Sequence, residues 1–418
     1  MNPTKYCLGA LLCAVLAACG GGGGGGADRH ENTTIDTAGR LAIAEDAGTG
    51  LRVYDLDGSR VEATLALANP PSAVYTSPGG RYALAFQRPQ DLVQVADGGV
   101  FQEDHGDHLH DYKQAPRLLG SRITGPQPTH YDDRAGQAAI FMDGREAAGA
   151  LASAVLFTDA NLAAGNLAAA VSFASAMHGF AEPNGNFLIA SYRAPGGTGP
   201  TQVEVYRRNG AQYTFVERLP EQCPGMHGSY TRAGVTFVGC SDGLLVVAPQ
   251  GTSTFAATRV ATPTGVGTIA GHPATARVIA FGNAGTPSTT RFYDVDPAAR
   301  TATPITIAGW TEGRVRRAHG FSRDGRHFFV LDDAGTLHVL EAAAAGWTSR
   351  KTISGAIAVM PSAAPFPQFA TNEARNEAYL SDPNGRQLVV LNTSTQEIAR
   401  RLPLDFRPTY LAWTGIKR

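Results

Sequence analysis

The chain repeats one pattern of short strands and glycine turns, and this repeat restricts its fold more than any other feature. In each unit a short strand leads through a glycine turn into an apolar strand, then into a second turn and strand. Eight units begin 41 to 56 residues apart. Their first strands start near Val74, His130, His178, His227, His272, His319, Phe369 and Tyr410. A period of roughly 40–50 residues made only of strands is typical of β-propeller blades.

The two ends of the repeat complement each other. Segment 407–413 supplies a single strand with nothing after it, whereas the strands expected in 40–67 have no innermost strand before them. The C-terminal strand therefore closes the ring beside the N-terminal strands and leaves no open sheet edge. The sequence predicts an all-β fold with a single propeller of eight blades, or of seven if one repeat is degenerate. Abundant glycine (49) and proline (25) with only 17 % charged residues favours strands and turns over helices.

The N-terminus has the features of a bacterial export signal. Lys5 precedes an apolar run, 6–18, that is too short to cross a bilayer as a permanent helix. The run ends in Leu-Ala-Ala-Cys, which resembles a lipobox, so cleavage before Cys19 would leave its thiol for acylation. An ordinary secretory peptide with an incidental Cys19 is the alternative. Seven glycines, 20–26, cannot hold a fixed backbone and predict a flexible tether.

These features predict three segments. Residues 1–18 form the signal peptide, 19–35 the lipidated cysteine with its glycine-rich tether, and 36–418 the propeller domain. We expect a monomer in the periplasm, held by its lipid at the inner or the outer membrane. Cys223 and Cys240 form an even pair in an oxidising compartment, which predicts a disulfide. A thiolate metal site, the alternative, would favour a CxxC spacing that the chain lacks.

The near-zero net charge of the chain argues against nucleic acid as a partner. The chain has 35 Lys and Arg against 36 Asp and Glu, and it has no basic patch or RNA-binding motif. A near-neutral domain lacks the field that drives phosphate-backbone binding. We therefore expect no nucleic-acid partner.

Five of the eleven histidines occupy the same position in the repeat. They are His130, His178, His227, His272 and His319. The first strand of each blade lines the central channel, so these side chains form a ring around it. Three or four imidazole nitrogens or carboxylate oxygens at ~2.0–2.2 Å satisfy zinc. We predict a metal site built by some of them, because the ring is too wide for all five to reach one ion. The alternative is that each histidine bonds to nearby backbone and merely fills the channel.

A second histidine cluster lies in an insertion between Gly98 and Pro116. Ten residues, 103–112, contain three histidines and four carboxylates, which is a metal-binding composition. His108 and His110 alternate on an extended chain and point the same way, and His105 precedes a glycine that lets the segment fold over. We predict a mobile loop that binds metal; a solvated polar loop is the alternative.

The strand order leaves the relation between the two clusters open. The insertion joins the third and fourth strands of its blade, so it emerges on the face opposite the start of the channel-lining strands. Either the loop reaches into the channel or there are two sites. His327 and His338 lie within strands without ligand spacing, and with His30 they are interpreted as structural or incidental.

The insertion and the Met-His-Gly and Ala-His-Gly strands resemble those of the AztD family of periplasmic zinc metallochaperones. The resemblance covers nearly all of the chain past the glycines. It implies a zinc carrier that passes Zn²⁺ to the substrate-binding protein of a zinc ABC importer. It further implies zinc binding by His105, His108 and His110 in the insertion, and by His178, His227 and His319 in the channel. Two features depart from the family: the lipobox with its tether, and the lack of a His-rich N-terminal tail, where only His30 is found.

A non-enzymatic zinc carrier is therefore the leading hypothesis, in which imidazoles and a carboxylate such as Asp111 hold the ion and the loop opens for exchange. Protonation of the imidazoles should weaken binding below about pH 6. A metal-dependent propeller enzyme is the second hypothesis, with Glu182 or Asp132 as a base nominated only by proximity. A metal-free lipoprotein scaffold is the third. Copper or nickel in place of zinc stays open, since histidine-rich sites bind copper at least as tightly.

Overall fold

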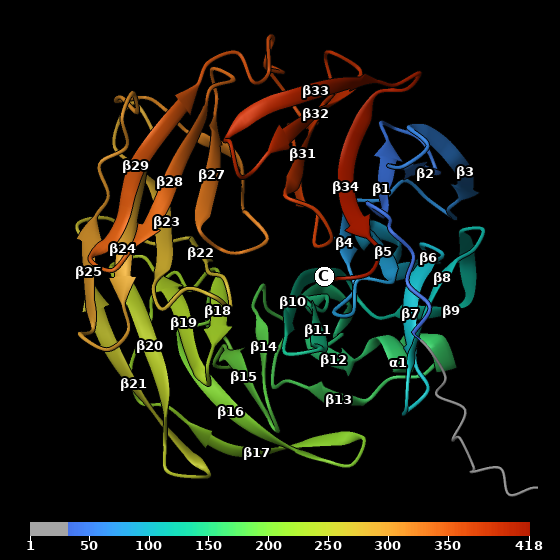
Figure 1. The fold of residues 1–418 in the computed structure, drawn as a ribbon. Coiled ribbons are helices and arrows are strands. Elements are labelled where there is room, and N and C mark those ends of the chain that lie inside the picture. The colour runs from blue at the N-terminus through green and yellow to red at the C-terminus, as the bar shows by residue number, and fades with distance from the viewer. Residues whose placement is uncertain (1–31) are drawn as a thin grey trace, which may run out of the picture.

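A computed structural model describes residues 32–418, and these form a ring of eight blades of four antiparallel strands each (Figure 1). Two neighbouring blades are joined into one eight-stranded sheet by a parallel bridge between Ala170 and Gln212. The predicted signal peptide, Cys19 and the glycine run lie outside the described residues. Among residues 32–418 no helix has the length and apolar character needed to span a membrane. The all-β propeller with eight blades is confirmed.

The blades are numbered in chain order, and the strands of each blade are given from the innermost strand outward. Blade 1 contains β34 (Pro408–Thr414), β1 (Arg40–Glu45), β2 (Gly50–Asp55) and β3 (Arg60–Ala66). Blade 2 contains β4 (Ala73–Thr76), β5 (Tyr82–Gln87), β6 (Leu92–Asp97) and β9 (Arg117–Thr124). Blade 3 contains β10 (Pro128–Arg134), β11 (Gln137–Met142), β12 (Ser153–Phe157) and β13 (Ala169–Ser172). Blade 4 contains β14 (Ala181–Asn184), β15 (Phe187–Tyr192), β16 (Gln202–Asn209) and β17 (Gln212–Arg218).

The other four blades repeat the same order. Blade 5 contains β18 (Ser229–Arg232), β19 (Val235–Cys240), β20 (Gly243–Gln250) and β21 (Thr254–Ala261). Blade 6 contains β22 (Thr268–Ala270), β23 (Val278–Ala284), β24 (Thr289–Asp296) and β25 (Thr301–Pro304). Blade 7 contains β26 (Arg316–Phe321), β27 (His327–Asp332), β28 (Leu337–Ala343) and β29 (Gly346–Ile353). Blade 8 contains β30 (Phe369–Thr371), β31 (Glu377–Asp382), β32 (Gln387–Asn392) and β33 (Glu397–Pro403).

The ring closes through the C-terminal strand, as the repeat predicts. β34 pairs antiparallel with β1, from Arg40 opposite Thr414 to Glu45 opposite Pro408. The indole Nε1–H of Trp413 donates to the carbonyl of Ala38 at 2.9 Å, which adds a side-chain contact to the closure. The first and last segments of the chain therefore complete one blade, and no innermost strand is left unpaired.

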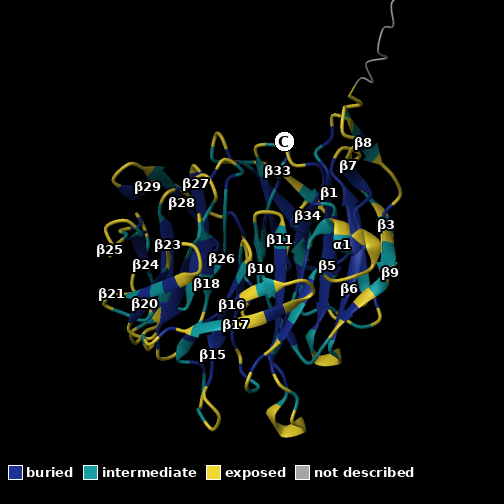
Figure 2. Ribbon diagram, turned by 90° about the horizontal axis from the view of Figure 1, so that it is seen from below, coloured by how far each residue is buried: buried dark blue, intermediate teal, exposed yellow. Residues whose placement is uncertain are grey.

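Apolar side chains fill the space between neighbouring blades. The middle strands are buried along most of their length, as in β5 and β27, whereas the outermost strands β3 and β33 alternate between exposed and half-buried residues. Figure 2 shows the same gradient, with buried strands inside and exposed connections at the edges. The propeller therefore has a series of small hydrophobic cores between neighbouring blades.

The antiparallel order gives the propeller two distinct faces. All innermost strands begin on one face, which we name the proximal face, and end on the other, the distal face. The insertion after β6 forms an antiparallel hairpin of β7 (Val100–Asp104) and β8 (Leu109–Lys113) on the distal face. The C-terminus lies on that face too (Figure 2).

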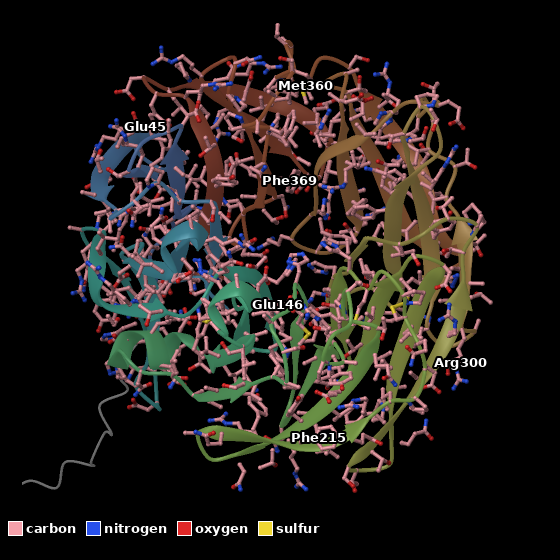
Figure 3. The ribbon with its side chains drawn as sticks, turned by 180° about the vertical axis from the view of Figure 1, so that it is seen from behind. Glu45, Glu146, Phe215, Arg300, Met360 and Phe369 are labelled. Carbon is pink, nitrogen blue, oxygen red and sulfur yellow. A yellow bond between two sulfur atoms is a disulfide. The ribbon has the colours of Figure 1, made fainter. Side chains whose placement is uncertain are left out.

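Short helical turns occupy three connections. They are η1 (Arg88–Gln90), η2 (Glu146–Ala148) and α1 (Asp159–Ala164). η2 lies in the β11–β12 connection on the proximal face, and Figure 3 places Glu146 and Phe369 close to the axis of the ring, with Phe215 and Arg300 at its rim. The Cys223–Cys240 disulfide is formed and fully buried.

Candidate metal centre

Three histidines from three successive blades converge at the proximal mouth of the channel. His130 lies on β10, whereas His178 and His227 lie in the turns just before β14 and β18. The Nε2 atom of His178 is 3.1 Å from Nε2 of His130 and 3.3 Å from Nε2 of His227. One ligand atom from each of the three lies within 4.8 Å of the others. These three histidines are named the channel triad.

The geometry of the channel triad fits a small tetrahedral ion. Nitrogen ligands at ~2.0–2.1 Å from a tetrahedral zinc ion lie roughly 3.3–3.4 Å from one another. The two Nε2–Nε2 distances through His178 come close to that value. The triad lines a cavity of about 210 Å³ together with Met226 and Asp132. Three protein nitrogens leave a fourth position free for water or an incoming ligand, as exchangeable zinc sites require.

Hydrogen bonds to the far ring nitrogens orient two of the three ligands. Nδ1 of His227 lies 2.8 Å from the carbonyl oxygen of Gly267, which can only accept, so Nδ1 carries the proton and Nε2 keeps its lone pair. Nδ1 of His178 lies 3.0 Å from Oδ2 of Asp143. A carboxylate behind a ligating imidazole fixes the tautomer and makes the ligand more basic.

Asp143 is held ionised for this role. Burial alone would raise the pKa of its carboxyl, but hydrogen bonds from His178 and Arg88 outweigh burial and hold that pKa below its ordinary value. Arg88 approaches Oδ2 of Asp143 to 2.8 Å. Arg88, Asp143 and His178 thus form a chain of hydrogen bonds that ends at the cavity.

His130 stays neutral at physiological pH. Burial, followed by Coulombic interaction with the neighbouring His178 and His227, lowers the pKa of His130 to about 4. A neutral imidazole has a lone pair to offer to a metal.

The structure places His319 and His272 outside the channel triad. His319 is enclosed by Phe281 and Phe328, with ring centroids at 5.0 and 5.6 Å, and its Nδ1 lies 3.1 Å from Nη1 of Arg316. Burial, with the charge of Arg316, puts the pKa of His319 well below its ordinary value. Nδ1 of His272 accepts from the backbone of Ala274.

The hairpin histidines form a second cluster. The ring centroids of His105, His108 and His110 lie 4.6 to 5.1 Å apart. His110 lies on β8 and His108 directly precedes that strand, and their rings contact each other with centroids 4.6 Å apart. The backbone N–H of His105 donates to the carbonyl of His108 and closes the turn. Oδ1 of Asp107 lies 2.5 Å from Nδ1 of His108. Their part in metal binding stays a prediction.

The hairpin differs from the expected mobile loop. It is a regular two-stranded ladder, and a bridge between Thr33 and His110 adds the N-terminal segment to β8. Asp111 has a structural role: its carboxylate accepts from the backbone of Ile35 at 2.8 Å and from Gln102, and it pairs with Arg418. Asp111 is buried and engaged by these partners, so its carboxylate is not available to the histidine cluster. The hairpin and the channel triad lie on opposite faces, so they are separate clusters.

Two other histidines are structural, as interpreted from sequence. His338 bonds to Asp332 and to the carbonyl of Ala308, and His327 bonds to Gln396. His30 lies outside the described residues.

Sequence reasoning missed Asp143 and Arg88. Asp143 is 35 residues from His178 and 55 from Arg88, and no local motif links them. The one available signal was the position of Asp143 directly after β11, at the end of a strand on the same face as the triad.

Known proteins with a similar sequence and a similar fold include a zinc chaperone. The chain is 28 % identical over 214 residues to the zinc chaperone AztD of Citrobacter koseri. Its fold matches the crystal structure of that AztD with a TM-score of 0.73 over 91 % of this chain and 99 % of the other, at 21 % identity. The chain is a relative of AztD. The resemblance read from the histidine motifs is thereby confirmed.

The extent of these matches differs between sequence and fold. The sequence match spans about half of this chain and 48 % of the length of AztD. An apo structure of AztD gives the same TM-score of 0.73 at 20 % identity. The dihydro-heme d1 dehydrogenase NirN shares the fold with a TM-score of 0.60 at 12 % identity, over 92 % of this chain and 77 % of the other. No family model matches the chain.

Proposed function

We propose that the chain is a periplasmic zinc metallochaperone rather than an enzyme. The observation that carries this is the channel triad. Nε2 of His178 lies 3.1 and 3.3 Å from Nε2 of the two other imidazoles, and hydrogen bonds to Nδ1 orient His178 and His227. The relationship to a protein named as a zinc chaperone supports zinc as the cargo. In this proposal Zn²⁺ is held by His130, His178 and His227.

The open side of the site suits a carrier. His178 and His227 are exposed, so the ion is reached from solvent and from a partner at the proximal face. A partner that offers its own imidazole or carboxylate at the fourth position can begin ligand exchange before any chain ligand leaves. We propose that this partner is the substrate-binding protein of a zinc ABC importer, and that Cys19 anchors the carrier to the membrane by its lipid.

A zinc competition titration against a chromophoric chelator, on protein purified without an affinity tag, tests the triad. His178→Ala and His227→Ala should each weaken zinc binding by at least about 100-fold, because each removes one of three ligands. His272→Ala is the matched control, since His272 occupies the same repeat position but lies outside the triad. Wild-type affinity in both triad variants would refute this site.

The hairpin histidines are proposed as a second zinc site, on the distal face. Their rings cluster, and Glu103 and Asp107 lie beside them to attract the cation. The double variant H108A/H110A should remove one equivalent of bound zinc in elemental analysis, with Leu109→Ala as the control on the same strand. An unchanged zinc content would remove the hairpin from the proposal.

Transfer to a partner needs its own measurement. Zinc-loaded protein is mixed with an excess of the metal-free substrate-binding protein or of a chelator of equal affinity. Transfer to the protein should be faster than release to the chelator. Equal rates would mean simple dissociation and would contradict the chaperone role.

A further inference from the structure

Two arginines at the start of β26, Arg316 and Arg317, carry charges that the described part of the chain leaves unbalanced. Both are half-buried, and across residues 32–418 neither has a carboxylate within ion-pair distance. The Nε of Arg317 is buried without a hydrogen-bond partner. A charge that is partly removed from water is stabilised by a counter-charge, so such groups are normally paired.

Nearby acidic groups do not supply the missing charge. Asp332 accepts from the backbone of Ala334 and Thr336 and bonds to His338. Asp333 lies 3.5 Å from Arg314. These two carboxylates, at and directly after the end of β27, thus already have other partners.

Neighbouring groups hold the two guanidiniums without neutralising them. The guanidinium of Arg316 lies 5.1 Å from the ring centroid of Phe281, and its Nη1 lies 3.1 Å from His319. The guanidinium of Arg317 lies 4.2 Å from the ring of Phe366. Aromatic faces stabilise a guanidinium but leave its N–H edge free for an oxyanion.

The strand is distorted where the two arginines lie. The pairing of β26 with β27 shifts register between Arg316 and Ala318, so Arg317 is the extra residue of a β-bulge. Bulges redirect side chains and are common beside functional sites. Each arginine is close enough to act on the other: burial, followed by the charge of Arg317, lowers the pKa of Arg316.

We propose that Arg316 and Arg317 form an anion-binding site at the proximal mouth of the channel, for a small molecule bearing carboxylate or phosphate groups. The planar N–H fork of arginine matches both oxyanions. β26 begins on the same face as the channel triad, across the ring from blades 3 to 5. The site is independent of zinc, and it stands whether or not the triad binds metal.

Thermal unfolding of the metal-free protein tests the site with citrate and inorganic phosphate as probes. Sodium chloride at equal ionic strength controls for screening. At 10 mM, at least one oxyanion should raise the Tm by about 2 °C or more, because a ligand that binds only the folded state stabilises it. A response to citrate alone identifies a carboxylate site, and a response to phosphate alone a phosphate site. No rise with either oxyanion beyond that with chloride overturns the proposal.

Substitutions of the two arginines test whether the oxyanion binds at this site. Arg316→Gln and Arg317→Gln should each weaken binding at least tenfold in isothermal titration of the responding oxyanion. Arg350→Gln, on the exposed outer strand of the same blade, should leave it unchanged. Undiminished binding in both R316Q and R317Q overturns the site.

A structural role for the arginines makes the opposite prediction about stability. If Arg316 served packing alone, Arg316→Met would lower the Tm in anion-free buffer. The anion site predicts an equal or higher Tm for R316M without anion, since an uncompensated charge is removed, together with loss of the response to citrate or phosphate. A lower Tm together with a retained anion response overturns the proposal.

Discussion

Asp143→Asn tests whether the carboxylate behind His178 helps to hold the metal. The substitution keeps the shape of the side chain and removes its charge. Asparagine can also present its amide to Nδ1 of His178, so the imidazole loses the constraint that places its lone pair on Nε2. Loss of such a partner typically costs 10–100-fold in metal affinity, which corresponds to about 1.4–2.7 kcal/mol.

The structure indicates the upper part of that range. Asp143 contacts His178 at 3.0 Å, its side chain is only 7 % exposed, and Arg88 holds it in place at 2.8 Å. The zinc dissociation constant is measured at pH 7.5 by competition with a chromophoric chelator. Asp242→Asn, an exposed carboxylate paired with Arg259, controls for the loss of one negative charge. Wild-type affinity in D143N, with an unchanged Tm, would refute the positioning role of Asp143.

The remaining predictions concern pH, redox state and export. Zinc affinity should fall as pH drops below about 6, because protons compete for the imidazoles; equal affinity at pH 5 and 7.5 would contradict histidine ligation. His319 is half-buried between aromatic rings, and its pKa is well below the ordinary value. Below about pH 6.5 the unfolded chain therefore binds one proton more than the folded chain, so the free energy of unfolding decreases as the pH is lowered. Urea unfolding of H319N should show a pH slope below pH 6.5 that is smaller by up to about one proton, and an unchanged slope would contradict this. Cys223→Ser with Cys240→Ser opens a cross-link of sequence separation 17 and should cost about 3 kcal/mol in the same assay. Cys19→Ala should abolish incorporation of labelled palmitate and release the protein from the membrane fraction, and persistent labelling would exclude Cys19 as the acylated residue.

Much of the fold is readable from the sequence because a propeller is a local repeat. Each blade is a run of antiparallel neighbours joined by short turns, so strand spacing and turn glycines such as Gly325 report structure that forms between adjacent residues. Closure by the strand at 408–414 was also predictable, since two incomplete units at the ends of one chain satisfy each other. The Cys223–Cys240 pair needed only an even cysteine count and an oxidising compartment.

The candidate site was predictable only in part. Residues at equivalent positions of successive repeats lie at the same level along the channel axis, and this is why the sequence could identify His130, His178 and His227. The same rule included His319 and His272, whose rings turn toward neighbouring blades and not toward the triad. Rotamer and packing decide that difference, and repeat position does not report them.

The amino-acid sequence by itself determined the all-β repeat, the closing strand and the two groups of histidines, and it favoured eight blades over seven. These follow from periodicity and composition, which act over a few tens of residues. The tertiary structure alone decided which histidines meet, that the hairpin lies on the opposite face from the triad, and that Asp111 is a buried anchor. It also joined Asp143 to His178 and left Arg316 and Arg317 without a counter-charge. Such contacts join residues from different strands and blades, and their distances depend on how neighbouring sheets pack.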